Sequence, residues 1–195
     1  IIIEGDASSA SYFLAAGALG GGPISIEGLG AKSIQGDIKL GYILKKMGAD
    51  VIFDDNNITI KSSKRLSGIK LDCRDIPDAA MVLVPCALYA DGPTLLTNIG
   101  SWRVKETNRI EAMSEGVAQL GGKVRFGDDW IEITPPRKLV SAHIQTFNDH
   151  RVAMSFALAS FRHPGDETTN SRKITFDNPK CVEKTYPEFF DEFSR

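Results

Sequence analysis

The chain has 195 residues, enough for one large domain or two small ones around a substantial hydrophobic core. Hydrophobic residues make up 42% of it, charged residues 25%, and the formal net charge is −2. This balance gives no overall basic field for nucleic acid or an anionic membrane surface, so a positively charged site has to be local. The longest apolar runs are too short to span a bilayer, and we expect no membrane partner.

The first predicted element is a nearly all-apolar helix at residues 5–19, GDASSASYFLAAGAL. A strand at residues 22–29 follows, and then a second helix at residues 34–48. Two alternating runs joined by the polar turn DDNN predict a hairpin that ends near residue 60. The order of the first unit is therefore helix, strand, helix, strand, strand.

The same order recurs downstream with a faint period of roughly 70 residues. Gly48 and Gly121 each follow a predicted helix, where a left-handed residue commonly ends it. The third unit stops after its second helix. In the second unit we expect the first helix at residues 76–90, the strand at residues 92–99 and the second helix at residues 105–121. In the third unit we expect them at residues 147–161, 172–179 and 186–193, in the same order.

Alternating strands and helices predict an α/β fold in which repeated units gather their apolar helices in the centre. An aspartate stands at the start of each of these helices and is a candidate N-cap: Asp6, Asp78 and Asp149. If the three helix starts meet at one edge of the domain, their positive dipole ends favour an anion there.

Lys105, Glu106 and Arg109 are predicted to lie in the first turn of the helix at residues 105–121. Two cations four residues apart on a helix repel each other. One interpretation is a surface ladder of ion pairs in which Arg103, Glu106 and Arg109 stabilise the helix weakly. The other is a bound anion that relieves the repulsion and holds Glu106 among cations as a proton carrier.

Two further segments allow a structural or a functional interpretation. Asp149, His150 and Arg151 form either a plain helix cap with solvated neighbours or, through Arg151, a fork for phosphate or carboxylate. Asp78 is likewise a plain cap or a site residue, and Lys184 is either a surface lysine or a ligand for an anion. Spacing alone does not separate these interpretations.

Six motifs in the same order along nearly the whole chain resemble 5-enolpyruvylshikimate-3-phosphate synthases: GDASSASYFLAAGAL, IPDAAM, SWRVKETNR, ITPP, NDHRVAM and KTYPEFF. The resemblance covers only the C-terminal part of such enzymes. It implies an enolpyruvyl transferase-like inside-out α/β barrel, with buried parallel helices inside and sheets outside. Residues 1–195 would be the C-terminal globular domain of a two-domain protein whose N-terminal domain is absent. The abrupt apolar opening at Ile1 fits a fragment.

The resemblance also implies a reaction. The family transfers the enolpyruvyl group of phosphoenolpyruvate to the 5-hydroxyl of shikimate 3-phosphate and releases phosphate, with no metal or organic cofactor. Asp78 then resembles the base or orienter at the hydroxyl, Glu106 the proton carrier at the methylene carbon, and Lys105 a contact to both substrates and a proton donor. The remaining residues resemble substrate-binding positions: Ser101, Arg109, Asp149, His150, Arg151 and Lys184.

Parts of the family's site are not in this chain, among them its Ser-Ser-Gln phosphate site. We therefore expect the isolated chain to be inactive without the N-terminal domain. Two alternatives stay open: a non-catalytic anion-binding module, and a relative that acts on UDP-N-acetylglucosamine. Three scattered cysteines favour a reducing compartment, so we expect the cytoplasm, or a plastid for a plant protein. The histidines show no metal-ligand spacing: His143, His150 and His163.

Overall fold

The structure is a computed structural model that describes residues 3–62, 65–161 and 172–194. Its first unit carries a three-stranded antiparallel sheet in the order β1-β3-β2. The DDNN turn joins β2 to β3, as predicted. The elements of this unit are α1 (Ala7–Ala16), the π turn η1 (Gly17–Gly21), β1 (Ile24–Glu27), η2 (Gly36–Ile38), α2 (Lys39–Met47), β2 (Asp50–Phe53) and β3 (Asn57–Lys61).

The second unit carries a four-stranded sheet in the order β4-β5-β7-β6, in which only the β4–β5 pair is parallel. Its strands β5, β7 and β6 repeat the arrangement of β1, β3 and β2. Its elements are β4 (Lys70–Asp72), η3 (Ala79–Val82), α3 (Leu83–Ala87), β5 (Thr94–Thr97), η4 (Gly100–Val104), α4 (Arg109–Gln119), β6 (Lys123–Phe126) and β7 (Trp130–Thr134).

The third unit carries a parallel pair, β8 and β9, which corresponds to β4 and β5 of the second unit. Its elements are β8 (Ala142–Ile144), α5 (His150–Ala157), η5 (Leu158–Ser160), β9 (Ile174–Phe176), η6 (Pro179–Lys184) and α6 (Phe189–Phe193). The predicted order of helices and strands is confirmed. Strands β4 and β8 were not predicted because each has only three residues and too little alternation to stand out.

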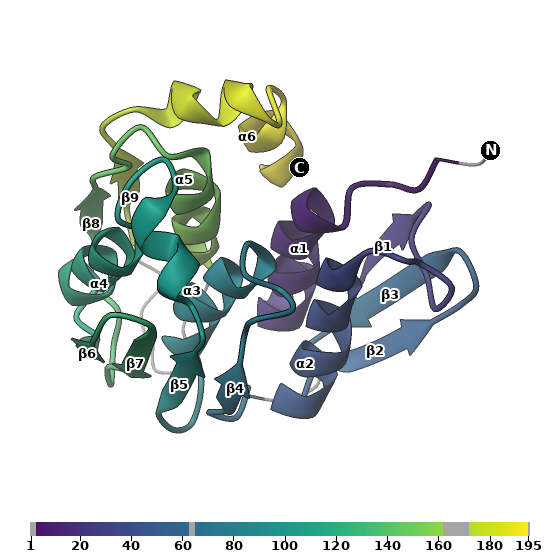
Figure 1. Cartoon of the computed structure of the whole chain (residues 1–195), viewed down its shortest axis with the longest axis horizontal. Helices are drawn as coiled ribbons and strands as arrows, with labels where there is room; N and C mark the ends of the chain where they lie inside the picture. The colour runs from purple at the N-terminus through teal and green to yellow at the C-terminus, as the bar shows by residue number, and fades with distance from the viewer. Residues whose placement is uncertain (1–2, 63–64, 162–171, 195) are drawn as a thin grey trace.

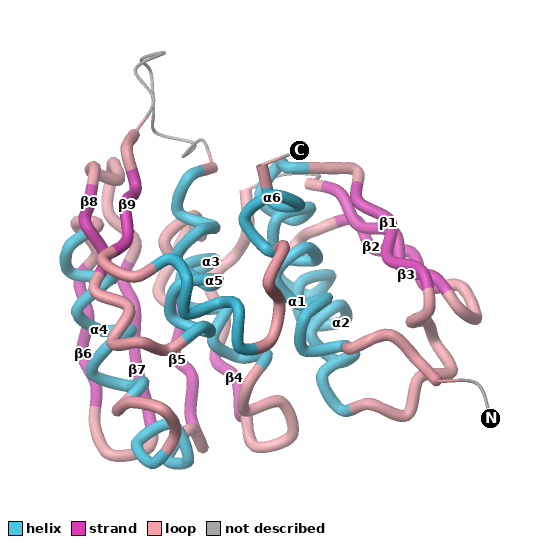
Figure 2. Tube along the Cα trace, turned by 90° about the horizontal axis from the view of Figure 1, so that it is seen from above, coloured by secondary structure: helices cyan, strands magenta, loops and turns pink. Residues whose placement is uncertain are grey.

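The helices α1, α3 and α5 lie in the centre of the molecule, and the three sheets lie outside them (Figures 1 and 2). All of α3 is buried, and so are seven of the ten residues of α1. Many of these residues are alanines, whose small side chains let neighbouring helices approach closely. The predicted α/β architecture with internal helices is therefore correct. Gly48 and Gly121 adopt the expected left-handed conformation, with φ of 116° and 88°.

Two of the three predicted N-caps are present. Asp6 accepts hydrogen bonds from the backbone N–H groups of Ser8 and Ser9, and Asp149 accepts one from that of Arg151. The prediction for Asp78 was wrong, since its side chain caps no helix. Its carboxylate instead contacts cations from other elements, which compete with the backbone for the same oxygens.

Two general features of the described residues bear on the sequence analysis. All three cysteines are free thiols inside the core: Cys73, Cys86 and Cys181. No helix within residues 3–62, 65–161 and 172–194 is both long and apolar enough to cross a membrane.

Candidate active site

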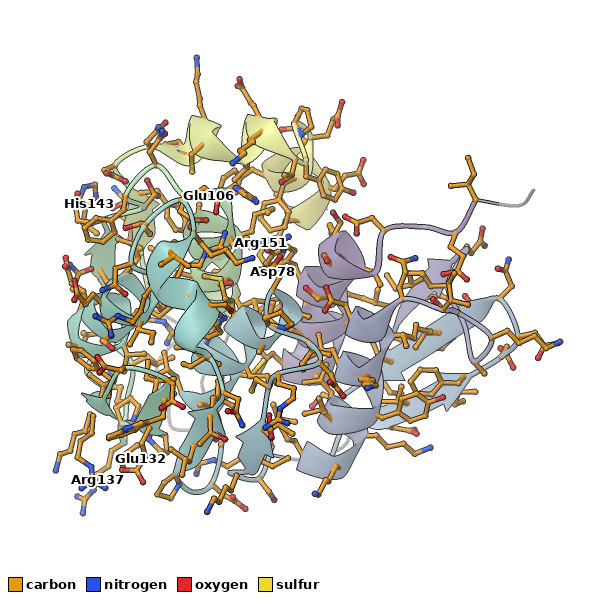
Figure 3. The ribbon with its side chains drawn as sticks, in the orientation of Figure 1. Asp78, Glu106, Glu132, Arg137, His143 and Arg151 are labelled. Atoms are coloured by element: carbon orange, nitrogen blue, oxygen red, sulfur yellow. The ribbon has the colours of Figure 1, made fainter. Side chains whose placement is uncertain are left out.

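The starts of the central helices carry one continuous cluster of charged side chains, part of which is labelled in Figure 3. Ion pairs link residues that lie up to 78 positions apart in the chain. The cluster combines four cations with three carboxylates, contributed by the second and third units: Lys105, Arg109, Arg151 and Lys184, and Asp78, Glu106 and Asp149. We call this set the charged cluster.

Arg109 is the centre of the charged cluster, and only 1% of its side chain is exposed. Its Nε donates to Asp149 Oδ2 at 2.7 Å, its Nη1 to Asp78 Oδ1 at 3.0 Å, and its Nη2 to Glu106 Oε2 at 2.7 Å. A buried guanidinium loses its hydration, and such a group is tolerated only when carboxylates and hydrogen bonds replace the water. Arg109 therefore joins the three carboxylates into one unit.

The loop before α4 brings Glu106 and Lys105 to this cluster. The prediction of a helical first turn was wrong, because α4 begins only at Arg109. Lys105 is extended, with φ −91° and ψ −153°, and Asn108 is a non-helical N-cap, so no helical hydrogen bonds run through this stretch. The expected repulsion between Lys105 and Arg109 is offset, because both cations contact the carboxylate of Asp78, which lies between them.

The surface-ladder interpretation is wrong in part. Glu106 and Arg109 do form an i, i+3 ion pair, but Arg109 is buried rather than on the surface. Arg103 turns away and pairs with Asp128 instead.

Asp78 receives cations from three directions. Besides Arg109, Lys105 Nζ lies 3.5 Å from Oδ1, and Arg151 Nη2 lies 3.3 Å from Oδ2. The indole N–H of the fully buried Trp102 donates to the carbonyl of Pro77 at 2.6 Å. This bond ties the turn that leads to Lys105 to the residue directly before Asp78. The bond thereby fixes the position of the Lys105 side chain relative to the Asp78 side chain.

Glu106 is the second carboxylate that faces several cations. Lys184 Nζ donates to its Oε1 at 2.6 Å, and Arg109 takes the other oxygen. The hydrogen bond from Lys184, more than any other contact, lowers the pKa of Glu106 to about 2. Lys184 ends η6 and remains 57% exposed, so its amino group is accessible from solution.

His150 follows the capping Asp149 and is almost completely buried. Its Nδ1 lies 3.9 Å from Asp149 Oδ1 and 4.0 Å from Glu106 Oε1, both too long for direct hydrogen bonds. Burial, together with the charge of Arg151, lowers the pKa of its imidazole, so the ring is neutral near pH 7. Of the other histidines, His143 contacts Thr175 on β9, and His163 lies outside the described residues.

Ser101 is the predicted site residue that stays apart from the charged cluster. It is exposed in η4, and within the described part of the chain no hydrogen bond connects it to the cluster. The structure therefore brings together seven of the predicted residues directly and places His150 beside them.

The first unit also contacts the charged cluster, and this contact was not predicted from the sequence. Tyr12 on α1 lies next to Arg151, with 3.4 Å between its hydroxyl and Nη1. Asp37 binds the hydroxyl of Ser8, and the charges of Arg151 and Asp78 act on its carboxyl. Burial raises the pKa of Asp37 above its ordinary value. A tyrosine in an apolar helix reads as core, so no local signal marks it.

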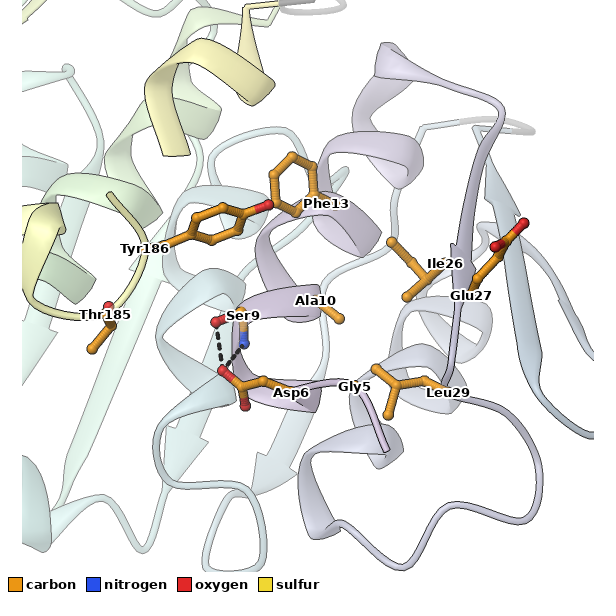
Figure 4. Close-up of a pocket in the computed structure, with 10 residues that line it drawn as sticks. All are labelled: Gly5, Asp6, Ser9, Ala10, Phe13, Ile26, Glu27, Leu29, Thr185 and Tyr186. Carbon is orange, nitrogen blue, oxygen red and sulfur yellow. Dashed lines mark hydrogen bonds between the residues drawn. The ribbon is translucent and has the colours of Figure 1, made fainter. Parts of the chain in front are cut away.

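A separate cavity of about 390 Å³ lies between α1, β1 and the segment after Lys184 (Figure 4). Its walls are mainly apolar. The carboxylate of Asp6, which also lines it, accepts hydrogen bonds from the backbone N–H and the hydroxyl of Ser9. None of the predicted site residues lines it. The lining residues are Gly5, Asp6, Ser9, Ala10, Phe13, Ile26, Glu27, Leu29, Thr185 and Tyr186.

Comparison with known proteins decides the family. The family model described as EPSP synthase (3-phosphoshikimate 1-carboxyvinyltransferase) matches residues 1–193. The chain belongs to the EPSP synthase family. The curated 3-phosphoshikimate 1-carboxyvinyltransferase of Janthinobacterium sp. (strain Marseille) is 50% identical over the whole chain, which spans 44% of that protein.

Solved structures agree with this membership of the EPSP synthase family. An EPSP synthase from Acinetobacter baumannii matches 97% of the chain with a TM-score of 0.80 and 29% identity, and the match covers 45% of that protein. The enolpyruvyl transferase NikO from Streptomyces tendae matches 98% of the chain with a TM-score of 0.69. At 18% identity, this second likeness concerns the fold alone. The chain thus spans less than half the length of the relatives it matches.

Proposed function

We propose that the chain is the C-terminal domain of a two-domain enzyme that transfers the enolpyruvyl group of phosphoenolpyruvate to the 5-hydroxyl of shikimate 3-phosphate. The observation that carries the proposal is the charged cluster at the helix starts, in a chain of the EPSP synthase family. Both substrates are anions, and the cluster holds one cation more than it holds carboxylates. The partner required for activity is the N-terminal domain of the same enzyme.

Asp78 is suited to orient the 5-hydroxyl and to accept its proton. Addition forms a bond from the hydroxyl oxygen to C2 of phosphoenolpyruvate while a proton is delivered to the methylene carbon. Elimination then removes a proton from the resulting methyl group and breaks the bond from C2 to the phosphate oxygen. Lys105 Nζ lies 3.5 Å from Asp78 Oδ1. Its amino group is therefore suited both to take part in the transfer of the hydroxyl proton and to balance the negative charge of the substrates.

Glu106 is suited to the proton transfers at the methylene carbon, and its low pKa sets a condition on them. Without substrate the group is ionised near pH 7 and accepts a proton but does not donate one. A phosphate or carboxylate that draws Lys184 away removes the largest cause of the low pKa. Substrate binding would thus prepare Glu106 for its role as a proton donor.

The cations divide into two groups by exposure. Lys105 and Lys184 are accessible and Arg151 is partly accessible, so these three are placed to bind the substrate anions directly. Arg109 has no exposed donor, and its contacts favour an indirect role in which it holds the carboxylates in position. Direct contact with phosphoenolpyruvate would require it to leave Asp78 or Glu106.

The remaining predicted residues take supporting roles in this proposal. Asp149 caps α5 and orients Arg109. The neutral, buried ring of His150 lies beside the cluster on the side facing the protein interior. Ser101, exposed beside the loop that carries Lys105, is available to a hydroxyl or phosphate of shikimate 3-phosphate.

A chimera tests the proposal: this chain replaces the matching segment of the Janthinobacterium relative. We expect phosphate release that depends on both phosphoenolpyruvate and shikimate 3-phosphate. Asp78→Asn in the chimera should abolish it while the protein stays folded by circular dichroism. A folded chimera that binds phosphoenolpyruvate without turnover would support an anion-binding module instead, and turnover with UDP-N-acetylglucosamine alone would contradict the assigned acceptor.

A further inference from the structure

Tyr12 brings the first unit into contact with the charged cluster. It lies on α1 with 1% of its surface exposed, and its ring packs edge-on against Phe189 of α6 at a centroid distance of 5.6 Å. In this position the hydroxyl lies 3.4 Å from Arg151 Nη1. The contact joins residues 139 positions apart.

The guanidinium of Arg151 is shared between two acceptors. Nη1 faces the Tyr12 hydroxyl, and Nη2 lies 3.3 Å from Asp78 Oδ2. Only 15% of the Arg151 side chain is exposed, so little water is available to replace a lost acceptor. The two contacts together determine the orientation of the Arg151 guanidinium.

The two acceptors differ in charge. Burial raises the pKa of Tyr12 to about 12, so its side chain is a neutral phenol at physiological pH. A neutral oxygen accepts a hydrogen bond from Arg151 without cancelling the positive charge. A carboxylate in the same place would hold the fork equally well but would neutralise the charge that an anionic substrate requires.

We propose that Tyr12 is a positioning residue that keeps Arg151 from closing into a two-pronged ion pair with Asp78, so that its charge stays available to phosphoenolpyruvate. This role rests on the proposed transferase function. Removal of the hydroxyl leaves Nη1 without this acceptor, and the carboxylate of Asp78, which Nη2 already contacts, can take both nitrogens. Parallel two-pronged pairing is the favoured geometry between arginine and a carboxylate.

Tyr12→Phe tests this role, because it removes one oxygen and keeps the ring against Phe189. The matched control is Tyr89→Phe. Tyr89 is also buried, its hydroxyl donates to Leu158 O at 3.0 Å, and it lies 3.4 Å from Arg172 Nη2, but beyond the opposite end of α5. Tyr89→Phe thus also removes a buried tyrosine hydroxyl next to an arginine, together with its hydrogen bonds to Leu158 O and Phe161 O, away from the charged cluster.

In the chimera we expect Tyr12→Phe to raise KM for phosphoenolpyruvate about tenfold, the scale of one charge-assisted hydrogen bond, and to change kcat much less. Tyr89→Phe should leave KM unchanged. The proposal is overturned if KM for phosphoenolpyruvate in both variants equals that of the unsubstituted chimera, or if it rises equally in both. This holds even where both variants lose stability.

A second measurement does not depend on turnover. In the ligand-free chain, a tighter pair with Asp78 should slow hydrogen exchange of the Arg151 guanidinium and shift its ¹⁵N signals in Tyr12→Phe but not in Tyr89→Phe. Unchanged signals in both variants would refute the positioning role. If the unmodified chimera shows no turnover, the transferase function fails, whereas this NMR comparison still decides on Tyr12.

Discussion

Arg109 Nε donates to Asp149 Oδ2 at 2.7 Å, and both side chains are almost completely buried. One residue begins α4 of the second unit, and the other caps α5 of the third. The bond therefore fixes α4 to the central helix α5 at the edge that carries the charged cluster. Stability and the geometry of the site depend on the same pair.

The first prediction concerns removal of the buried cation. Arg109→Met should lower the free energy of unfolding by about 3–5 kcal/mol, because it leaves carboxylates without their central partner. Urea unfolding measures this, with Arg103→Met as the control. Arg103 pairs with Asp128 on the surface, and such exposed pairs contribute at most about 1 kcal/mol. Equal losses in the two variants would contradict the central role of Arg109.

Two helix caps allow a second comparison. Asp149→Asn and Asp6→Asn both keep an oxygen that can accept from the helix backbone. Only Asp149 also balances a buried cation, so Asp149→Asn should destabilise the chain by about 2 kcal/mol more than Asp6→Asn. Thermal or urea unfolding of the pair checks it, and an equal effect would mean that Asp149 acts as a cap alone.

The third prediction is a pH dependence from Glu106. Its pKa is lowered in the folded chain from 4.5 to about 2, so its ion pairs add stability that is fully present above about pH 4.5. This contribution is lost as the pH falls through the range from 4.5 to 2. Wild type and Glu106→Gln should therefore differ by a constant unfolding free energy at neutral pH and converge in acid. A gap that widens in acid would reverse the assigned sign.

Lys184 gives a direct test of what lowers that pKa. In Lys184→Met the main cause is removed, and the Glu106 carboxyl should titrate at a clearly higher pH in a ¹³C NMR experiment. Lys32→Met, which alters an exposed pair with Asp55 far from the site, should leave the titration unchanged. No shift in Lys184→Met would assign the low pKa to Arg109 instead.

The accessible cations supply the last prediction. In the chimera, Lys105→Ala and Lys184→Ala should raise KM for phosphoenolpyruvate by about tenfold or more. Their unfolding free energies should change by less than about 1 kcal/mol, since both lysines are partly exposed. Unchanged kinetics with a large loss of stability would mean that both lysines are structural.

The sequence by itself determined the repeated units, their hairpins and the apolar helices, because these follow from local periodicity and turn residues. Gly48 and Gly121 end their helices as predicted, and Asp6 and Asp149 cap theirs. Strands β4 and β8 were not predicted because their stability comes from pairing with a distant strand rather than from their own pattern.

Only the tertiary structure decided what the charged residues do. Spacing placed Lys105 and Arg109 on one helix in mutual repulsion, whereas folding brings Asp78 from 31 positions upstream of Arg109 to lie between them. Asp78 is lost as a helix cap for the same reason, and Tyr12 contacts Arg151 of the charged cluster although its segment reads as core. Electrostatic partners are chosen by distance in space, and side chains from separate units become neighbours only once the central helices have packed.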